Sequence, residues 1–244
     1  MNGQPQHTPQ ASYKTEANNC ILPTSQFSMD VNNVRSSLLT GGALLERAGF
    51  AATYFTALGL AGKTIATGPL FARDVLPRVL ARGHELGCHT YDHCLAWETP
   101  SPVYLASVEA NHRAFAAVGV APATHSYPIS YPRPATKVRL GEKFRACRGG
   151  GQSANRGIAD LNYLNSFFLE QCHGDFAPVE RVIAEVEARG GWLIFSVHDV
   201  TENHTRFGCS PEFFARVVER AALSGATVLP MAKALDLLGA PRTA

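Results

Sequence analysis

The chain has 244 residues, of which 45% are hydrophobic and 17% charged, and its formal net charge at pH 7 is +2. This composition is typical of a globular domain with a sizeable core and excludes extensive disorder. The small net charge, without basic clusters, predicts no nucleic-acid partner. No apolar run approaches the ~20 residues of a membrane-spanning helix. The first 20 residues lack the apolar core of a signal peptide, so with Met1 as the native start we expect a cytoplasmic protein.

The six cysteines are scattered along the chain without a CxxC pair. They are Cys20, Cys88, Cys94, Cys147, Cys172 and Cys209. In a cytoplasmic protein this spacing predicts reduced thiols that act as small core residues. Cys94 follows His93 directly and is a weak candidate for a metal ligand.

The first half of the chain alternates between apolar, strand-like runs and segments with helical periodicity. After a polar tail at residues 1–21, the predicted strands are 26–31, 51–57, 84–90, 124–129 and 144–148. The predicted helices run from 37 or 40 to 48, and over 70–82, 102–117 and 135–140. Ser101 is the expected N-cap of the third helix, and Gly49 and Gly83 are expected to end the first two.

The second half continues the alternation after a segment at 149–176 whose pattern favours no single element. Residues 191–198 and 226–231 predict strands, and residues 179–188, 211–222 and 231–238 predict helices, with Ser210 as the cap of the second. Unbroken alternation of strand and helix predicts an α/β domain with one parallel sheet and crossover helices. About seven such units favour a distorted (β/α)7-type barrel over residues 22–244 rather than an open sheet.

Polar residues follow several predicted strands at the point where each strand ends. Asp30 ends the first strand, His89 and His93 follow the third, and His198 and Asp199 follow the apolar run 191–197. Each has an ordinary reading on its own: loop histidines, a turn-capping aspartate, a core histidine. Together they lie on the rim where parallel α/β folds bind ligands. The HExxH zinc-protease pattern is excluded, because Thr90 follows the first histidine.

The chain resembles the polysaccharide deacetylase family, also called the NodB-homology domain or carbohydrate esterase type 4. The segments that carry the resemblance are FSMD (27–30), GHELGCHTYDH (83–93), SYPISYP (126–132), ADLNYL (159–164) and WLIFSVHDV (192–200). The resemblance implies a distorted barrel of about seven strands. It also implies metal-dependent hydrolysis of an N-acyl group, usually N-acetyl, on an amino sugar.

The resemblance further implies roles for individual residues. His89 and His93 would bind a divalent metal together with a carboxylate, most simply zinc, with iron, cobalt and nickel as alternatives. His198 would protonate the leaving amine, and Asp160 would orient it. The backbone N–H of Ile129 would donate to the oxyanion, and Tyr127 and Arg148 are the further candidates for contact with the oxyanion or the substrate.

The first motif departs from the family pattern, which typically has two adjacent acids. Here Asp30 stands alone between Met29 and Val31. As the metal ligand it would leave the general base missing, or supplied by Asp199 or another residue. As the base it would leave a weak amide oxygen, that of Asn32, to the metal. We favour the ligand role, because two imidazoles alone would hold a metal poorly.

The leading hypothesis is a cytoplasmic N-deacylase that removes an acetyl or formyl group from an amino sugar, in a surface-glycan or lipopolysaccharide O-chain precursor. One alternative is a catalytically impaired protein that binds a glycan or a partner protein. Another is an amidohydrolase for a non-sugar amide.

Overall fold

The computed structural model describes residues 12–14, 24–30, 37–65 and 68–240. Of residues 12–14, 24–30, 37, 65 and 68–69 it describes the backbone only. The strands are β1 (Ser12–Lys14), β2 (Thr24–Asp30), β3 (Ala52–Thr56), β4 (Thr64–Ile65), β5 (Gly68–Pro69), β6 (Glu85–Cys88), β7 (Thr124–Ser126), β8 (Ala146–Arg148), β9 (Ile158–Asp160), β10 (Phe167–Phe168), β11 (Trp192–Val197) and β12 (Thr227–Val228).

The helices include one π-helical and two 3-10 segments. They are η1 (Ser37–Gly42), α2 (Ala43–Arg47), η2 (Leu58–Leu60), α3 (Val75–Ala81), α4 (Ser101–Ala116), α5 (Pro134–Gly141), η3 (Leu169–Cys172), α6 (Ala177–Arg189), α7 (Pro211–Leu223) and α8 (Met231–Leu237). None of the described helices is long and apolar enough to cross a membrane.

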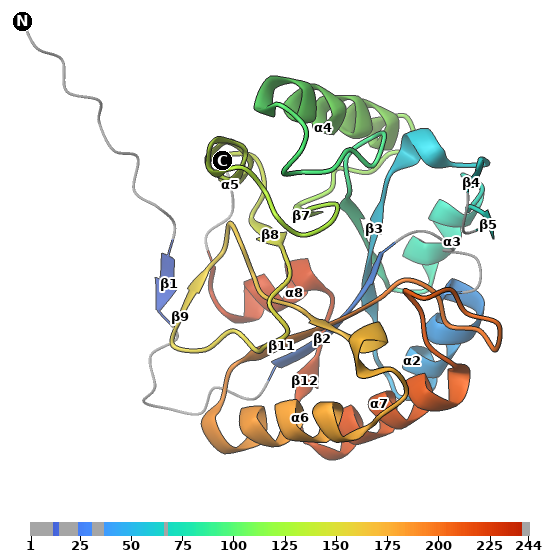
Figure 1. Cartoon of the computed structure of the whole chain (residues 1–244), viewed down its shortest axis with the longest axis vertical. Coiled ribbons are helices and arrows are strands. Elements are labelled where there is room, and N and C mark those ends of the chain that lie inside the picture. The colour runs from blue at the N-terminus through green and yellow to red at the C-terminus, as the bar shows by residue number, and fades with distance from the viewer. Residues whose placement is uncertain (1–11, 15–23, 31–36, 66–67, 241–244) are drawn as a thin grey trace, which may run out of the picture.

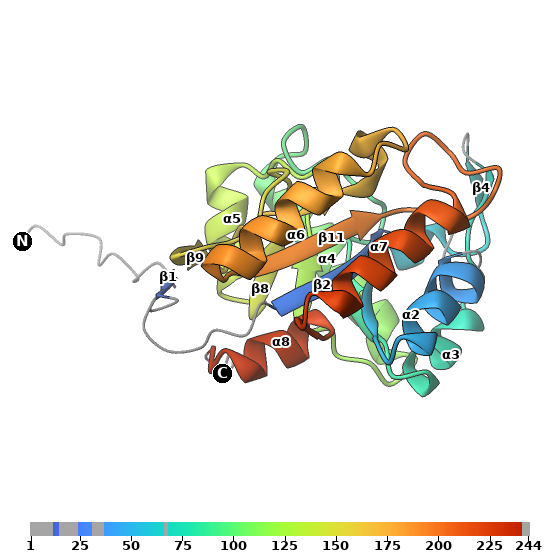
Figure 2. The same cartoon turned by 90° about the horizontal axis from the view of Figure 1, so that it is seen from below.

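The main sheet is parallel throughout, with strand order β10-β11-β2-β3-β6-β7-β8 and with β12 paired to β2. Past β8 the chain turns toward β10, and the bonds Gly149 N to Leu164 O (2.8 Å) and Gln152 N to Ser166 O (3.0 Å) link the two segments. The sheet therefore curls toward closure as a barrel-like α/β domain. Helices α6 and α7 lie side by side on one part of its outer surface, and α4 and α5 cover another (Figures 1 and 2).

The central strands are buried on both faces, as expected for parallel strands under helices. All six residues of β11 are buried. Leu193, Phe195 and Val197 belong to the large cluster that includes the apolar faces of α6 and α7, whereas Ile194 packs in a second cluster with Phe55. Alternate residues of β11 therefore face opposite sides of the sheet, the helices on one side and the barrel interior on the other.

Most predicted elements are confirmed, with local shifts that have structural causes. Helix α3 begins at Val75 rather than residue 70, and β4 and β5, which pair antiparallel, precede it in the chain. Pro100, not Ser101, is the N-cap of α4; the Ser101 hydroxyl instead bonds the Thr136 hydroxyl at 2.8 Å. Ser210 caps α7 as predicted, accepting a hydrogen bond from the N–H of Phe213 at 3.1 Å.

Two segments carry more structure than the sequence pattern indicates. Part of the predicted N-terminal tail forms β1, which pairs antiparallel with β9; the rest of residues 1–21 lies outside the described residues. The segment 149–176 contains β9, β10 and η3. The second of these strands is only two residues long and pairs with β11.

The amino-terminal rim of the barrel is held by Glu85 at the start of β6. Its carboxylate accepts hydrogen bonds from the hydroxyls of Thr53 (3.0 Å) and Thr124 (2.6 Å) and from the N–H of Ala232 (2.8 Å). Burial raises the pKa of the Glu85 carboxyl, and these bonds partly offset the increase. Glu85 therefore ties α8 to three strands at the rim opposite the candidate site.

Candidate functional site

His89 and His93 lie in the loop that follows β6, and both line one pocket. Their ring centroids are 4.9 Å apart at 66°. Thr90 and His93 have positive φ angles of 59° and 54°, which turn the chain sharply after the strand. The loop is fixed to α4, because Ser107 Oγ accepts from the N–H of Tyr91 at 3.0 Å and donates to the Asp92 carboxylate at 3.1 Å.

The hydrogen bond from Nδ1 of His89 sets the tautomer of its imidazole ring. Its Nδ1 lies 2.8 Å from the carbonyl oxygen of Ser126, which can only accept, so Nδ1 carries the proton. The lone pair is then on Nε2, the form in which an imidazole binds a metal ion. His89 is only 3% exposed, and this burial keeps its ring in the same orientation. The donor chemistry of this histidine thus fits a divalent metal.

His198 follows β11 and lines the same pocket. Its Nδ1 donates to the carbonyl oxygen of Phe207 at 3.2 Å, and its backbone N–H donates to the same oxygen at 3.3 Å. The two bonds fix the residue against the loop after β11. Nδ1 is therefore the ring nitrogen that the loop holds.

Glu170 is the carboxylate among the pocket residues that the sequence analysis missed. It lies in η3, lines the pocket and places Oε1 3.9 Å from Nδ1 of His198, with the Glu170 side chain 13% exposed and the His198 side chain 16% exposed. It follows a strand of two residues in a segment without clear periodicity. The sequence therefore offers no signal that would have identified it.

Asp199, a candidate for the general base, contacts the loop that follows β11. Its carboxylate is buried and accepts two hydrogen bonds from Thr205, from the N–H at 2.8 Å and from the hydroxyl at 2.7 Å. It does not line the pocket. Asp199 instead anchors the loop whose Phe207 carbonyl binds His198.

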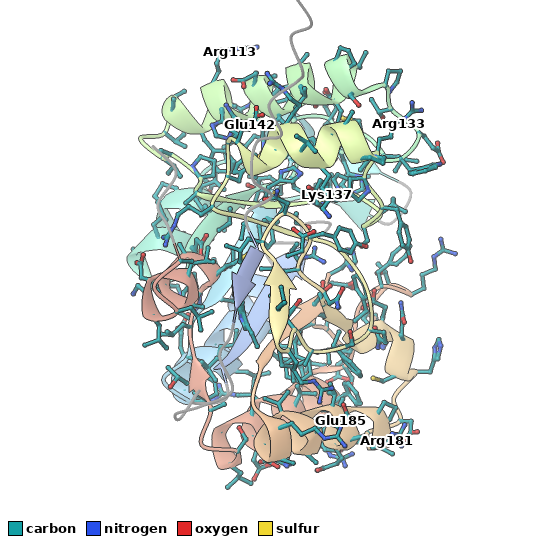
Figure 3. The ribbon with its side chains drawn as sticks, turned by 90° about the vertical axis from the view of Figure 1, so that its left-hand side faces the viewer. Arg113, Arg133, Lys137, Glu142, Arg181 and Glu185 are labelled. Carbon is teal, nitrogen blue, oxygen red and sulfur yellow. The ribbon has the colours of Figure 1, made fainter. Side chains whose placement is uncertain are left out.

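Asp160, predicted to orient His198, has its described contacts elsewhere. Its carboxylate pairs with Lys137 of α5 and accepts from the N–H of Asn162 at 2.9 Å. Figure 3 shows Lys137 on the side of α5 that faces β9. Asp160 does not line the pocket, and the carboxylate beside His198 is that of Glu170.

Ile129 and Tyr127, the predicted contacts of the oxyanion or the substrate, follow β7 and line the pocket. Ile129 and Ser130 have positive φ angles of 59° and 69°, and the N–H of Ser130 donates to Tyr127 O at 2.9 Å, which closes a tight turn. The Tyr127 hydroxyl donates to Asn162 O at 2.9 Å, and burial raises the pKa of this phenol. Tyr127 therefore offers its ring, not its hydroxyl, to the pocket.

Arg148, a predicted contact of the oxyanion or the substrate, is only 1% exposed and does not line the pocket. Its guanidinium bonds the hydroxyls of Ser126 and Ser166, the second at 3.2 Å. It also lies 5.5 Å from the ring centroid of Phe55 and 5.8 Å from that of Phe168. Because Phe168 lines the pocket, Arg148 supports the wall from behind.

Asp30 is the last residue of β2, where its backbone pairs in register with Phe55. Its side chain lies outside the described residues. Within the part of the chain that was searched, no group of three or more His, Cys, Asp and Glu side chains is placed to hold a metal ion. The described metal-ligand candidates are thus His89 and His93, and Asp30 is placed by its backbone alone.

The pocket brings together residues from four strand ends and one 3-10 turn, in a volume of about 390 Å³. Its lining residues are His89, His93, Tyr127, Ile129, Ser130, Tyr131, Phe168, Glu170, Gln171, His198 and Phe207. His89 and His93, which follow β6, share the pocket with His198, which follows β11. The imidazole of His198 lies beside the carboxylate of Glu170. Ligand atoms and a proton donor in one pocket are what metal-assisted hydrolysis requires.

Comparison with known proteins identifies similar sequences and folds. Residues 41–143 match the family model of polysaccharide deacetylase. Among solved structures, a family 4 acetyl xylan esterase from Clostridium thermocellum, in complex with a cobalt ion, has a TM-score of 0.60 and 17% identity, and the alignment covers 89% of this chain and 93% of that one. No curated protein is similar enough to count as a match.

Two further structures share the fold. The chitin deacetylase from the fungal pathogen Colletotrichum lindemuthianum has a TM-score of 0.59 and 16% identity, over 88% of each chain. A structure described as T48 deacetylase with substrate has the same score and identity, over 88% of this chain and 92% of that one. The resemblance to the polysaccharide deacetylase family is therefore confirmed, by a sequence match over residues 41–143 and by a fold shared with family 4 carbohydrate esterases and deacetylases.

Proposed function

We propose that the protein is a metal-dependent hydrolase that removes an N-acyl group, acetyl or formyl, from an amino sugar. The observation that carries the proposal is the single pocket in which His89 and His93 meet His198 and Glu170. The first pair supplies ligand atoms, and the second pair supplies an imidazole beside a carboxylate.

His89, His93 and Asp30 would hold the metal. His89 supports this assignment most directly, because its bond to Ser126 O leaves Nε2 unprotonated. Imidazole and carboxylate ligands favour zinc, and iron, cobalt and nickel suit the same donors. When bound, such an ion polarises the acyl carbonyl and makes water a stronger acid at neutral pH.

The protein's own groups would perform the proton transfers. His198 releases a proton from Nε2 to the leaving amine, while its Nδ1 stays bonded to Phe207 O. The negative charge of Glu170, 3.9 Å from Nδ1, attracts the protonated imidazole. With Asp30 as a ligand, Glu170 is also the pocket carboxylate available to accept the proton of the attacking water. The N–H of Ile129 donates to the developing oxyanion.

We further propose that the substrate is an amino-sugar unit of a surface-glycan precursor, such as a lipopolysaccharide O-chain. The protein would act on this precursor in the cytoplasm. Support comes from the sequence expectation alone. Cell fractionation tests the location, and glycan analysis of a strain that lacks the protein tests the substrate class.

The decisive experiment measures released acetate and formate from a panel of N-acylated amino sugars. The purified protein is loaded in turn with zinc, cobalt, nickel and iron(II). We expect acylate release that is lost in His89→Ala and in His198→Ala, with metal content reduced only in the first. Protein that retains its metal and releases no acylate would refute the proposal, and glycan binding in that case would support the non-catalytic alternative.

A further inference from the structure

A second pocket, of about 400 Å³, lies between η3, the loop that follows β11 and the start of α7. It adjoins the histidine pocket, because Glu170 lines both. Phe207, a wall residue of the histidine pocket, is flanked in the loop by Arg206 and Gly208, which line the second pocket. A ligand bound in the histidine pocket can therefore extend across this border into the second pocket.

Basic side chains line the second pocket. Arg206, His173 and His204 lie on its wall and are exposed to solvent. The guanidinium of Arg206 lies over the ring of Phe207, 4.6 Å from the ring centroid. Stacking holds the plane of the guanidinium and leaves the N–H groups at its edge for hydrogen bonds to an anion. Arg206 is therefore the main candidate for an anion contact in this pocket.

His204 offers a second polar contact. Its Nδ1 lies 2.8 Å from the carbonyl oxygen of Thr205, which can only accept, so Nδ1 carries a proton. Nε2 is then an acceptor in the neutral ring and a donor in the protonated ring. A phosphate monoester suits both forms, because it loses its second proton at about pH 6 and has three strong acceptor oxygens.

The charges around the pocket favour an anion. Glu170 is the acid among the lining residues, and its Oε1 lies 3.9 Å from Nδ1 of His198, on the border with the histidine pocket. Ser210, which also lines the second pocket, caps α7, so the positive end of this 13-residue helix adds to the field of the arginine. A tetrahedral phosphate accepts from several directions and fits this arrangement better than a planar carboxylate.

We propose that the second pocket binds a phosphate group carried by the acylated amino sugar, so that the substrate is a sugar phosphate or a phosphate-linked sugar rather than a neutral glycan. This inference rests on the proposed function for the sugar part of the ligand. The phosphate accepts hydrogen bonds from Arg206 and His204, while the acyl group enters the histidine pocket. Nucleotide-linked and lipid-linked sugars present the same phosphate, and only the group beyond it differs.

The inference predicts tighter binding of a phosphorylated sugar. N-acetylglucosamine 1-phosphate should bind about tenfold more tightly than N-acetylglucosamine, the gain expected of a hydrogen-bonded contact to a charged group. Arg206→Gln should remove this gain and keep the affinity for the neutral sugar within about twofold of wild type. Arg216→Gln is the matched control, because Arg216 is also exposed and lies 4.3 Å from the ring centroid of Phe176, but lines neither pocket.

The experiment is calorimetric titration of the metal-loaded wild type, Arg206→Gln, His204→Gln and Arg216→Gln. The probes are N-acetylglucosamine, its 1-phosphate, UDP-N-acetylglucosamine and N-acetylglucosamine linked to citronellyl diphosphate. Raising the salt from about 0.1 to about 1 M shortens the Debye length from about 10 to about 3 Å, so the phosphate gain should shrink. A further gain with the UDP sugar would identify a nucleotide-linked source, and a further gain with the citronellyl sugar a lipid-linked one.

The inference and the proposed function fail in different ways. A phosphate gain that is lost in Arg206→Gln, reduced in His204→Gln and kept in Arg216→Gln, without acylate release from any probe, would uphold the phosphate site and refute the catalytic proposal. Acylate release combined with a phosphate gain that persists in Arg206→Gln and His204→Gln, as phosphate bound at the metal would give, would overturn the phosphate site alone. Equal affinity of the wild type for the neutral and the phosphorylated sugar would also overturn it.

Discussion

Replacement of Asp199 tests whether its carboxylate supports the structure or takes part directly in catalysis. In the structure, Asp199 accepts hydrogen bonds from the N–H and the hydroxyl of Thr205, at 2.8 and 2.7 Å. The loop that these bonds close presents the carbonyl of Phe207 to His198. We therefore expect Asp199→Ala to lower stability first and to lower activity through the position of His198.

The magnitude follows from the two bonds. Hydrogen bonds to a charged group contribute about 1.5–3 kcal/mol each. The gain from no longer burying the carboxylate offsets part of the sum, so the net loss in unfolding free energy is about 3 kcal/mol. For a chain of this length that loss lowers the melting temperature by about 6–12 °C.

The assay pairs thermal unfolding with acylate release for Asp199→Ala, Asp199→Asn and Thr205→Val. The last variant removes the hydroxyl bond to Asp199 and changes no residue of the pocket. An anchoring role predicts that Thr205→Val reproduces about half of the stability loss and a smaller loss of activity. Unchanged melting of Asp199→Asn with acylate release reduced by more than about 1000-fold would refute the reasoning and restore the role of a base.

Four further outcomes are expected. Gly208→Ala should destabilise the same loop, because a Cβ there would overlap the backbone oxygen of the anchoring aspartate, and lower denaturant midpoints measure this. Cys88 and Cys147, whose thiol pKa values burial raises to about 12, should resist iodoacetamide at pH 8 until the protein is unfolded, as mass spectrometry would show. His89→Ala should weaken zinc binding by more than about 100-fold in a chelator competition, and wild-type affinity would contradict its role as a ligand. Burial lowers the pKa of His112 to about 4. The contribution of the neutral imidazole to stability is therefore present above the unfolded pKa of about 6.5 and is lost as the pH falls toward 4. The unfolding midpoint of His112→Phe should depend less on pH in that interval than the midpoint of the wild type.

Elements with strong local patterns were predictable from the sequence. The run WLIFSV forms β11 with every residue buried, and Ser210 caps α7 before Pro211 as expected. These features depend on neighbours within a few residues, which a sequence pattern captures. Ser101 failed as a cap because Pro100 takes that position and the serine hydroxyl finds a partner on α5 instead.

Features that depend on distant pairing were not predictable. Glu170 reaches His198 because β10 pairs with β11 through Phe167 and Phe195, residues far apart in the sequence. The resemblance pairs Asp160 with His198, whereas in the structure the Asp160 carboxylate forms an ion pair with Lys137 of α5. In both cases the choice of partner is made by the tertiary structure, not by the residues nearby.

The alternation of side chains along a strand bears on the different surroundings of His198 and Asp199. Neighbouring residues of a strand face opposite sides, so a histidine and an aspartate in sequence cannot both enter a pocket on one face. In β11, Ile194 packs in the interior cluster and Val197 in the cluster under the helices. His198 continues the first face and Asp199 the second. The order His-Asp therefore assigns one residue to the pocket and the other to the loop anchor.

The same alternation bears on the lone acid of the first motif. The register pairs Met29 with Tyr54 and Val197, and both partners belong to the cluster under the helices. Position 30 pairs with Phe55, a residue of the interior cluster. By register, position 30 thus shares the interior face on which His198 continues β11, and position 29 shares the opposite face. This backbone register agrees with our proposal that Asp30 is the first-motif acid of the site, with Glu170 as the second carboxylate.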